Sequence, residues 1–352
     1  MKRHLLGVAA AVLGTVLISG AGFAAATASA AAPVDTTVTL PLFGAPLSFD
    51  ITTDPGGAIT NVAVTPADAN TVATKLRPHK VVFQSANPAD PTATARIVIK
   101  SGHGGQSVSA RAGSLAAVSG PGSWSGDVFG TGTATSVKFT IAALTDGTPD
   151  ITGVSSSDGT AVVGTVDHSS GDGQEGDSGS SARVSVKFTS ATGDQSRSLT
   201  ISVRLSTDED GTTSAKLSIS LGRMRGVALD AATAAGVHTW NGTLCDNSAA
   251  SITYTVALDG SVSAVTATPA TAVVKTHDGS INVKFSDTES VRISVRMDDS
   301  GMIRTNVSQN LRCNSGNPTT NVTTSIPTPD TGGGNNDGGG SGRGDHKGGK
   351  NG

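Results

Sequence analysis

The sequence is poor in charge and in aromatic side chains, and each shortage argues against a class of protein. Charged residues make up 15% and aromatic residues 3% of the 352-residue chain, a balance that argues against solvated helices. Acidic residues outnumber basic ones, 28 to 25, for a formal net charge of -3. A nucleic-acid binder needs a basic face to displace counterions from phosphate, so we expect no nucleic-acid partner. After residue 30 no apolar run is long enough to span a membrane.

The N-terminus has the order of a secretory signal peptide. A basic start, Met1-Lys2-Arg3, is followed by an apolar stretch at 5–18 and then by small residues that lead to Ala28 and Ala30. We predict cleavage after Ala30, because small residues at both of those positions fit the signal-peptidase pocket. The apolar core is shorter than the ~20 residues of a spanning helix. We therefore expect an extracellular, secreted chain, free or retained at the cell envelope.

Alternation of polar and apolar residues indicates strands. It is clear at 137–141, 182–188 and 290–296, as antiparallel strands with one solvated face require. Helical spacing occurs only at 227–235, which we interpret as a linker turn or short helix. The predicted fold class is all-β.

The same strand signatures return three times in the same order. Trp124-Ser125-Gly126 matches Trp240-Asn241-Gly242, and Phe49, Phe139 and Tyr254 occupy corresponding strands. Two further sets of matching segments are 80–83, 186–188 and 283–285, and then 96–99, 199–204 and 291–296. Gly- or Asp-containing turns separate the segments in each copy, as hairpins require.

These matches divide the chain into repeats. We predict a signal peptide at 1–30, β-sandwich repeats at 31–118, 119–235 and 236–316, and a disordered Gly-rich tail at 317–352. The arrangement resembles the immunoglobulin-like repeats of many secreted bacterial surface proteins. That resemblance rests on strand order and implies an adhesive or wall-associated role.

The chain has two cysteines, Cys245 and Cys313, in a sequence addressed to an oxidising compartment. We therefore predict a disulfide that ties together the ends of the third repeat.

Several motifs suggest chemistry, and each has a simpler structural explanation. The string 176–179, Gly-Asp-Ser-Gly, looks like the segment around the nucleophile of chymotrypsin-like proteases, but no matching histidine segment precedes it. It lies in an acidic Gly/Ser insertion that carries Asp158, Asp167, His168, Asp172, Glu175 and Asp177, which are potential calcium ligands without EF-hand spacing. Trp124 and Trp240 suit either sugar stacking or, because they repeat, a structural anchor. We assign no catalytic, cofactor or metal residue.

The tail contains two short motifs. Residues 328–332 are similar to a sortase signal but have Thr in place of Leu, and Arg343-Gly344-Asp345 copies the integrin tripeptide.

The expected function is that of a non-enzymatic structural or adhesive protein. Its partner would be an envelope polysaccharide or protein. The alternatives are a polysaccharide-binding module, which the tryptophans suggest, and a secreted hydrolase, which the insertion suggests.

Overall fold

The computed structural model describes residues 26–29, 35–66, 70–102, 105–170, 178–208 and 210–321. Most of the predicted signal peptide and most of the predicted tail, including the motifs at 328–332 and 343–345, lie outside these residues. Within the described ranges no helix is both long and apolar enough to cross a membrane.

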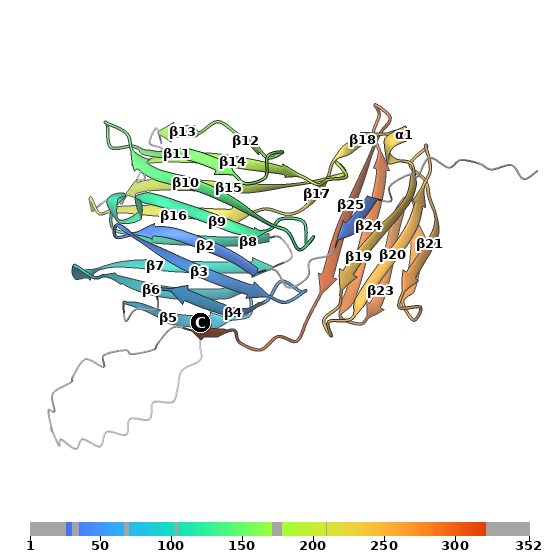
Figure 1. Cartoon of the computed structure of the whole chain (residues 1–352), viewed down its shortest axis with the longest axis horizontal. Coiled ribbons are helices and arrows are strands. Elements are labelled where there is room, and N and C mark those ends of the chain that lie inside the picture. Colours follow the sequence, from blue (N-terminus) through green and yellow to red (C-terminus); the bar gives the residue numbers. More distant parts are fainter. Residues whose placement is uncertain are drawn as a thin grey trace, which may run out of the picture.

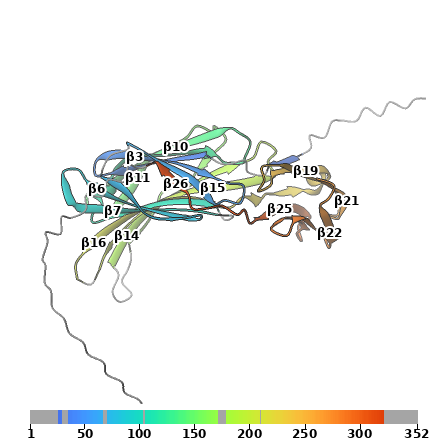
Figure 2. The ribbon, with the colours of Figure 1, turned by 90° about the horizontal axis from the view of Figure 1, so that it is seen from below.

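Strands account for most of the described chain, which confirms the all-β prediction. A four-residue helix, α1 (Ala231–Ala234), lies inside the 227–235 segment and is capped by Asp230, whose side chain accepts a hydrogen bond from Thr233 N. Figures 1 and 2 show that the strands form a larger and a smaller sandwich, side by side.

The larger sandwich consists of two antiparallel sheets, to one of which a short parallel strand is added. Within the described residues the first sheet has the order β11-β10-β9-β2-β3-β4-β26, and the main path of the second is β12-β14-β15-β16-β8-β7-β6-β5. The first sheet contains β2 (Asp35–Leu42), β3 (Ala45–Thr53), β4 (Ile59–Thr65), β9 (Gly120–Asp127), β10 (Ala134–Ala143), β11 (Pro149–Ser156) and β26 (Thr319–Asn321). The second contains β5 (Thr71–Arg77), β6 (Lys80–Asn87), β7 (Asp90–Gly102), β8 (Gly105–Ala112), β12 (Val162–Val163), β13 (Asp167–Ser170), β14 (Ser178–Thr189), β15 (Gln195–Thr207), β16 (Thr213–Leu221) and β17 (Arg225–Gly226).

Each of these sheets is made of two halves with mirrored strand order. Residues 35–112 supply β2, β3 and β4 to one sheet and β5 to β8 to the other, and residues 120–221 supply β9 to β11 and β12 to β16. The halves meet where β2 pairs with β9 and β8 pairs with β16, both antiparallel. The first strand of one half therefore joins the first strand of the other, and the last joins the last, as an approximate twofold axis would produce.

Consequently, the segments 31–118 and 119–235 do not form two separate sandwiches. They share both sheets and one hydrophobic core, which runs from Val38 to Leu221. The physical reason is that open edge strands expose unpaired backbone groups, and edge-to-edge joining pairs those groups.

The smaller sandwich has its own core and corresponds to the segment 236–316. Its sheets have the orders β1-β19-β20-β21 and β18-β25-β24-β23-β22. Its strands are β1 (Ala26–Ser29), β18 (Ala228–Asp230), β19 (Gly236–Thr243), β20 (Ala249–Val256), β21 (Val262–Thr268), β22 (Val273–His277), β23 (Ser280–Ser286), β24 (Glu289–Met297) and β25 (Met302–Leu311). Strands β19 to β21 and β22 to β25 repeat the three-plus-four pattern of the first unit. The second unit has the same pattern if β12 and β13, which both pair with β14, are taken as one position.

The first and last strands of the third unit join no other unit. Instead, β1 lies parallel to β19, and β18 pairs with the start of β25. Because β1 lies within the predicted signal peptide, cleavage after Ala30 would remove it and leave the edge of β19 open.

An aromatic pair bridges the two sheets in every unit. The pairs are Phe49 with Phe83, Trp124 with Phe188 and Trp240 with Phe285, with ring centroids 5.4, 6.4 and 6.1 Å apart. Both tryptophans are buried. A Cβ at Gly126 would lie 3.0 Å from the Trp124 ring, which explains the glycine two residues after this tryptophan on the same strand face.

The C-terminal boundary of the fold differs from the predicted one. Thr319–Asn321, assigned from the sequence to the disordered tail, forms β26 and pairs in parallel with β4. The sequence does not predict this strand, because its three residues are all polar and show no alternation of polar and apolar side chains.

Candidate ligand cavity at the junction of the two sandwiches

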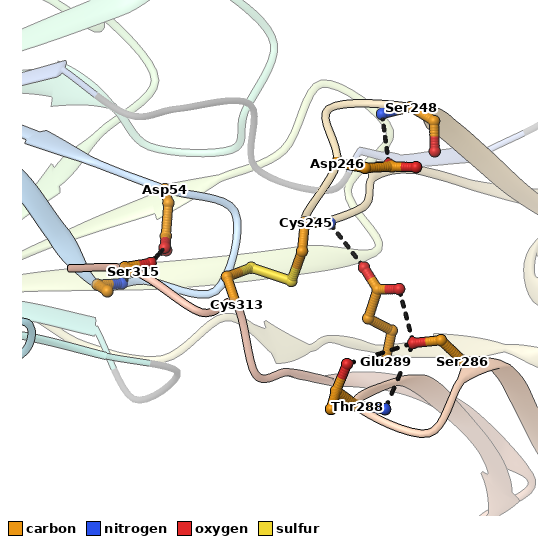
Figure 3. The surroundings of a disulfide bond; sticks show 10 residues. Asp54, Cys245, Asp246, Ser248, Ser286, Thr288, Glu289, Cys313 and Ser315 are labelled. Carbon is orange, nitrogen blue, oxygen red and sulfur yellow. Dashed lines mark hydrogen bonds between the residues drawn. A yellow bond between two sulfur atoms is a disulfide. The ribbon is translucent and has the colours of Figure 1, made fainter.

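The predicted disulfide lies at the junction of the two sandwiches (Figure 3). Cys245 follows β19 and Cys313 follows β25, with Cα atoms 5.1 Å apart. The backbone N–H of Cys245 donates a 2.6 Å hydrogen bond to Glu289 Oε1, and Ser286 Oγ donates to Glu289 Oε2 at 2.7 Å. This carboxylate therefore ties the turn that carries Cys245 to the neighbouring sheet.

The turn between β3 and β4 packs against this region from the larger sandwich. At Gly56 a Cβ would lie 2.6 Å from Leu311 O and 3.0 Å from Cys313 Sγ. The β3–β4 turn and the segment after β25 therefore approach more closely than a side chain at position 56 would allow. Beside it, Ser315 Oγ donates to Asp54 Oδ2 (Figure 3). The close approach at Gly56 and the hydrogen bond between Ser315 and Asp54 together hold the end of β25 against the larger sandwich.

Next to these contacts, a cavity of about 340 Å³ lies between the two bodies. The ends of strands and turns of the larger sandwich form one wall, and β19 and β25 form the other. The polar residues central to its chemistry are Gln106, Gln195, Arg197, Trp240, Ser308 and Gln309.

Two buried polar atoms on the walls lack a partner. Among the described residues, Gln106 Oε1 and Trp240 Nε1 are the buried side-chain atoms without a hydrogen bond, and both residues line this cavity. Each such atom costs about 1–3 kcal/mol when it is removed from water and left unpaired. Native proteins leave few of them, so their coincidence in one cavity marks it as the candidate site.

The positive charge of Arg197 has a structural use. Its Nε donates to Gly222 O at 2.7 Å and its Nη1 donates to Val128 O at 2.8 Å. Burial lowers the pKa of Arg197 to about 10, and the nearby charge of Asp127 opposes that shift. The guanidinium remains charged at neutral pH and joins the end of β16 to the loop after β9.

Of the protease-like string, Ser178 and Gly179 lie in the described residues, and the described backbone keeps Ser178 apart from His168. Ser178 is the first residue of β14 and pairs with Thr207, whereas His168 pairs across β13 with Ala182, four positions along β14. Four strand residues span about 13 Å, which is too far for direct proton transfer. The His168 Nε2 atom lies instead 2.9 Å from Asp150 Oδ1. Neighbouring residues 171–177 are outside the described residues.

Within its described residues, 158–170, the predicted acidic insertion contains the two short strands β12 and β13. Asp158 accepts hydrogen bonds from Thr160 N and Thr160 Oγ1, which is a turn-forming role. Asp172, Glu175 and Asp177 lie outside the described residues. No group of three metal-ligating side chains occurs in the part of the chain that the structure describes.

The burial of both tryptophans supports the structural-anchor interpretation. Trp124 is 2% and Trp240 1% exposed, so neither indole face is open to a sugar ring. Trp240 nevertheless lines the cavity, and its N–H is a buried donor without a partner. Sequence reasoning missed this role, and it missed Gln106 and Arg197 entirely, because these residues are distant in the chain and form no motif.

Comparison with known proteins gave no match: no family model, curated protein or solved structure is significantly similar to the chain.

Proposed function

We propose that the protein is exported and acts as a non-enzymatic structural or adhesive protein of the cell envelope. Its partner in this proposal is an envelope polysaccharide or protein. The signal-peptide pattern at 1–30 supports export. The observation that carries the structural role is the junction, where the chain crosses between the sandwiches at two places.

The first crossing is anchored on both sides. Strand β17 pairs with β15 of the larger sandwich, and its Gly226 N donates a 3.2 Å hydrogen bond to Asn306 Oδ1 of β25. A Cβ at Gly226 would clash with the carbonyl oxygen of Thr305, so β17 and β25 are in backbone contact. A linker bound to both bodies restricts their relative motion.

The second crossing runs the opposite way. After β25 and Cys313 the chain returns to the larger sandwich, contacts Asp54 through Ser315 and forms β26 on the edge of β4. Two anchored crossings hold the sandwiches at a fixed orientation. A fixed orientation suits a protein that spaces or attaches components of an envelope.

The test is fractionation of the cells that produce the protein. We expect the full chain to remain on isolated envelopes through washing and to recover an envelope polysaccharide or protein in a pull-down. A matched chain that ends at residue 321 should behave in the same way, because the proposed role belongs to the sandwiches. Complete recovery in washed culture fluid, with no partner in the pull-down, would overturn the proposal.

A further inference from the structure

Two residues that line the cavity between the sandwiches carry a buried polar atom without a partner, one a donor and the other an acceptor. The donor is the N–H of Trp240, which is 1% exposed, and the acceptor is Gln106 Oε1. The two residues come from different sandwiches, and sites between domains are a common location for small ligands. An occupant that pairs both atoms has to accept from one wall and donate to the other.

This pairing restricts the chemistry of the occupant. A carboxylate or phosphate only accepts, so it can serve Trp240 but not Gln106 Oε1. An ammonium group only donates, so it fails at Trp240. A hydroxyl group both donates and accepts, so it can serve Trp240 Nε1 and Gln106 Oε1.

The remaining polar wall suits several hydroxyl groups. Gln195 is buried, and Ser308 and Gln309 lie on the opposite side; each of these side chains can both donate and accept. The charges on the wall are mixed, because Arg197 and Arg223 face the same space as Asp54. Arg197 already donates to two backbone carbonyl groups, so it does not define an anion site.

The size restricts the occupant further. A volume of about 340 Å³ is near the lower end of the range of roughly 300–1,000 Å³ for small-molecule sites. The space therefore suits a molecule of one ring rather than a chain.

We propose that this cavity binds a single sugar ring or a cyclic polyol through hydrogen bonds, with Trp240 Nε1 as donor and Gln106 as acceptor. The site goes beyond the envelope role and does not require it. It also differs from sugar stacking, because the indole contributes its N–H and keeps its faces in the core.

The two tryptophans allow a direct test by NMR. The protein has two indole N–H groups, one at Trp124 and one at Trp240, and Trp240→Phe assigns the two cross-peaks. Titration with D-glucose, N-acetyl-D-glucosamine and myo-inositol should shift the Trp240 cross-peak saturably with at least one probe. The Trp124 cross-peak should stay in place and report that the fold is intact.

Variants test the acceptor. Gln106→Leu should weaken binding of the responding probe about tenfold, since it removes one hydrogen bond without adding charge. Gln84→Leu makes the same change at an exposed position on β6 and should leave binding unchanged. If Gln106→Leu does not fold, Gln106→Met, which keeps the length of the side chain without the carbonyl oxygen, provides the same comparison.

Three results would overturn the proposal. One is the absence of any saturable shift with the three probes, which would mean that water alone fills the cavity. Another is a saturable response to inorganic phosphate without a response to the sugars, which would assign an anion site. The third is equal binding by Gln106→Leu and the unmodified chain, provided that Trp124 reports an intact fold.

Discussion

Aspartate side chains shape the turns in all three units. In most cases Oδ1 accepts the N–H of the residue two positions later, as in Asp146 to Thr148 and Asp259 to Ser261. These hydrogen bonds to the charged form lower the pKa of the carboxyl groups. Carboxyl groups with a lowered pKa, most of them in turns, are Asp90, Asp146, Asp210, Asp230, Asp246, Asp259, Asp287 and Asp298.

The first prediction concerns the stability of the fold at acidic pH. A carboxyl group whose pKa is lower in the folded state stabilises the fold above its unfolded pKa, and this contribution is lost as pH falls through the folded value. The urea midpoint should therefore change little between about pH 6 and pH 5 and fall below about pH 4. Urea titrations followed by circular dichroism measure it. A midpoint that stays constant down to about pH 3 would contradict the role given to these turns.

A second prediction concerns the repeated tryptophan. Trp124 is 2% exposed and packs against Phe188, so Trp124→Ala should reduce the free energy of unfolding by about 3–5 kcal/mol. Val162→Ala, at a site that is 63% exposed, should change it by less than about 0.5 kcal/mol. Equal urea midpoints for the two variants would show that Trp124 is not a core anchor.

The positions of the strands were more predictable from the sequence than the way in which strands of different units pair at their edges. Alternating side chains place strands such as 182–188 and 290–296, and the repeated signatures give their order within each unit. The joining of β2 to β9 was not predictable, because the joined strands and the unjoined β19 have the same kind of alternation. Strand β26 and the cavity have no sequence signal, since both depend on residues far apart in the chain.

The disulfide is the element-scale feature that can be tested most simply. It closes a loop of 68 residues within the smaller sandwich, for which chain entropy gives about 4 kcal/mol of stabilisation. The double variant Cys245→Ser/Cys313→Ser should lower the stability of the smaller sandwich by about that amount. The larger sandwich has a separate core, so its unfolding transition should move less.

Reduction of the unmodified protein is the matched control for the double variant. Both forms should show the same urea midpoint for the smaller sandwich. An unchanged midpoint after loss of the disulfide would contradict the stabilising role.

At the scale of the whole molecule, three related units are used in two ways. Two of them merge through their first and last strands into one double sandwich, and the third remains single beside it. The corresponding edge strands of the third unit, β19 and β25, contribute to the cavity wall instead. One repeated architecture thus supplies both a broad scaffold and a junction with a polar interior.

The fixed junction is the central claim, and the distance between the sandwiches tests it most directly. Spin labels at Leu144→Cys and Leu258→Cys, which are 43% and 64% exposed, report from the larger and the smaller sandwich respectively. Pulsed electron–electron double resonance on the full chain should give one narrow distribution of distances between the two labels. Deletion of residues 317–321, which removes β26, should broaden it. A broad distribution in the full chain, equal to that of the deletion, would show that the sandwiches move independently and would contradict the account.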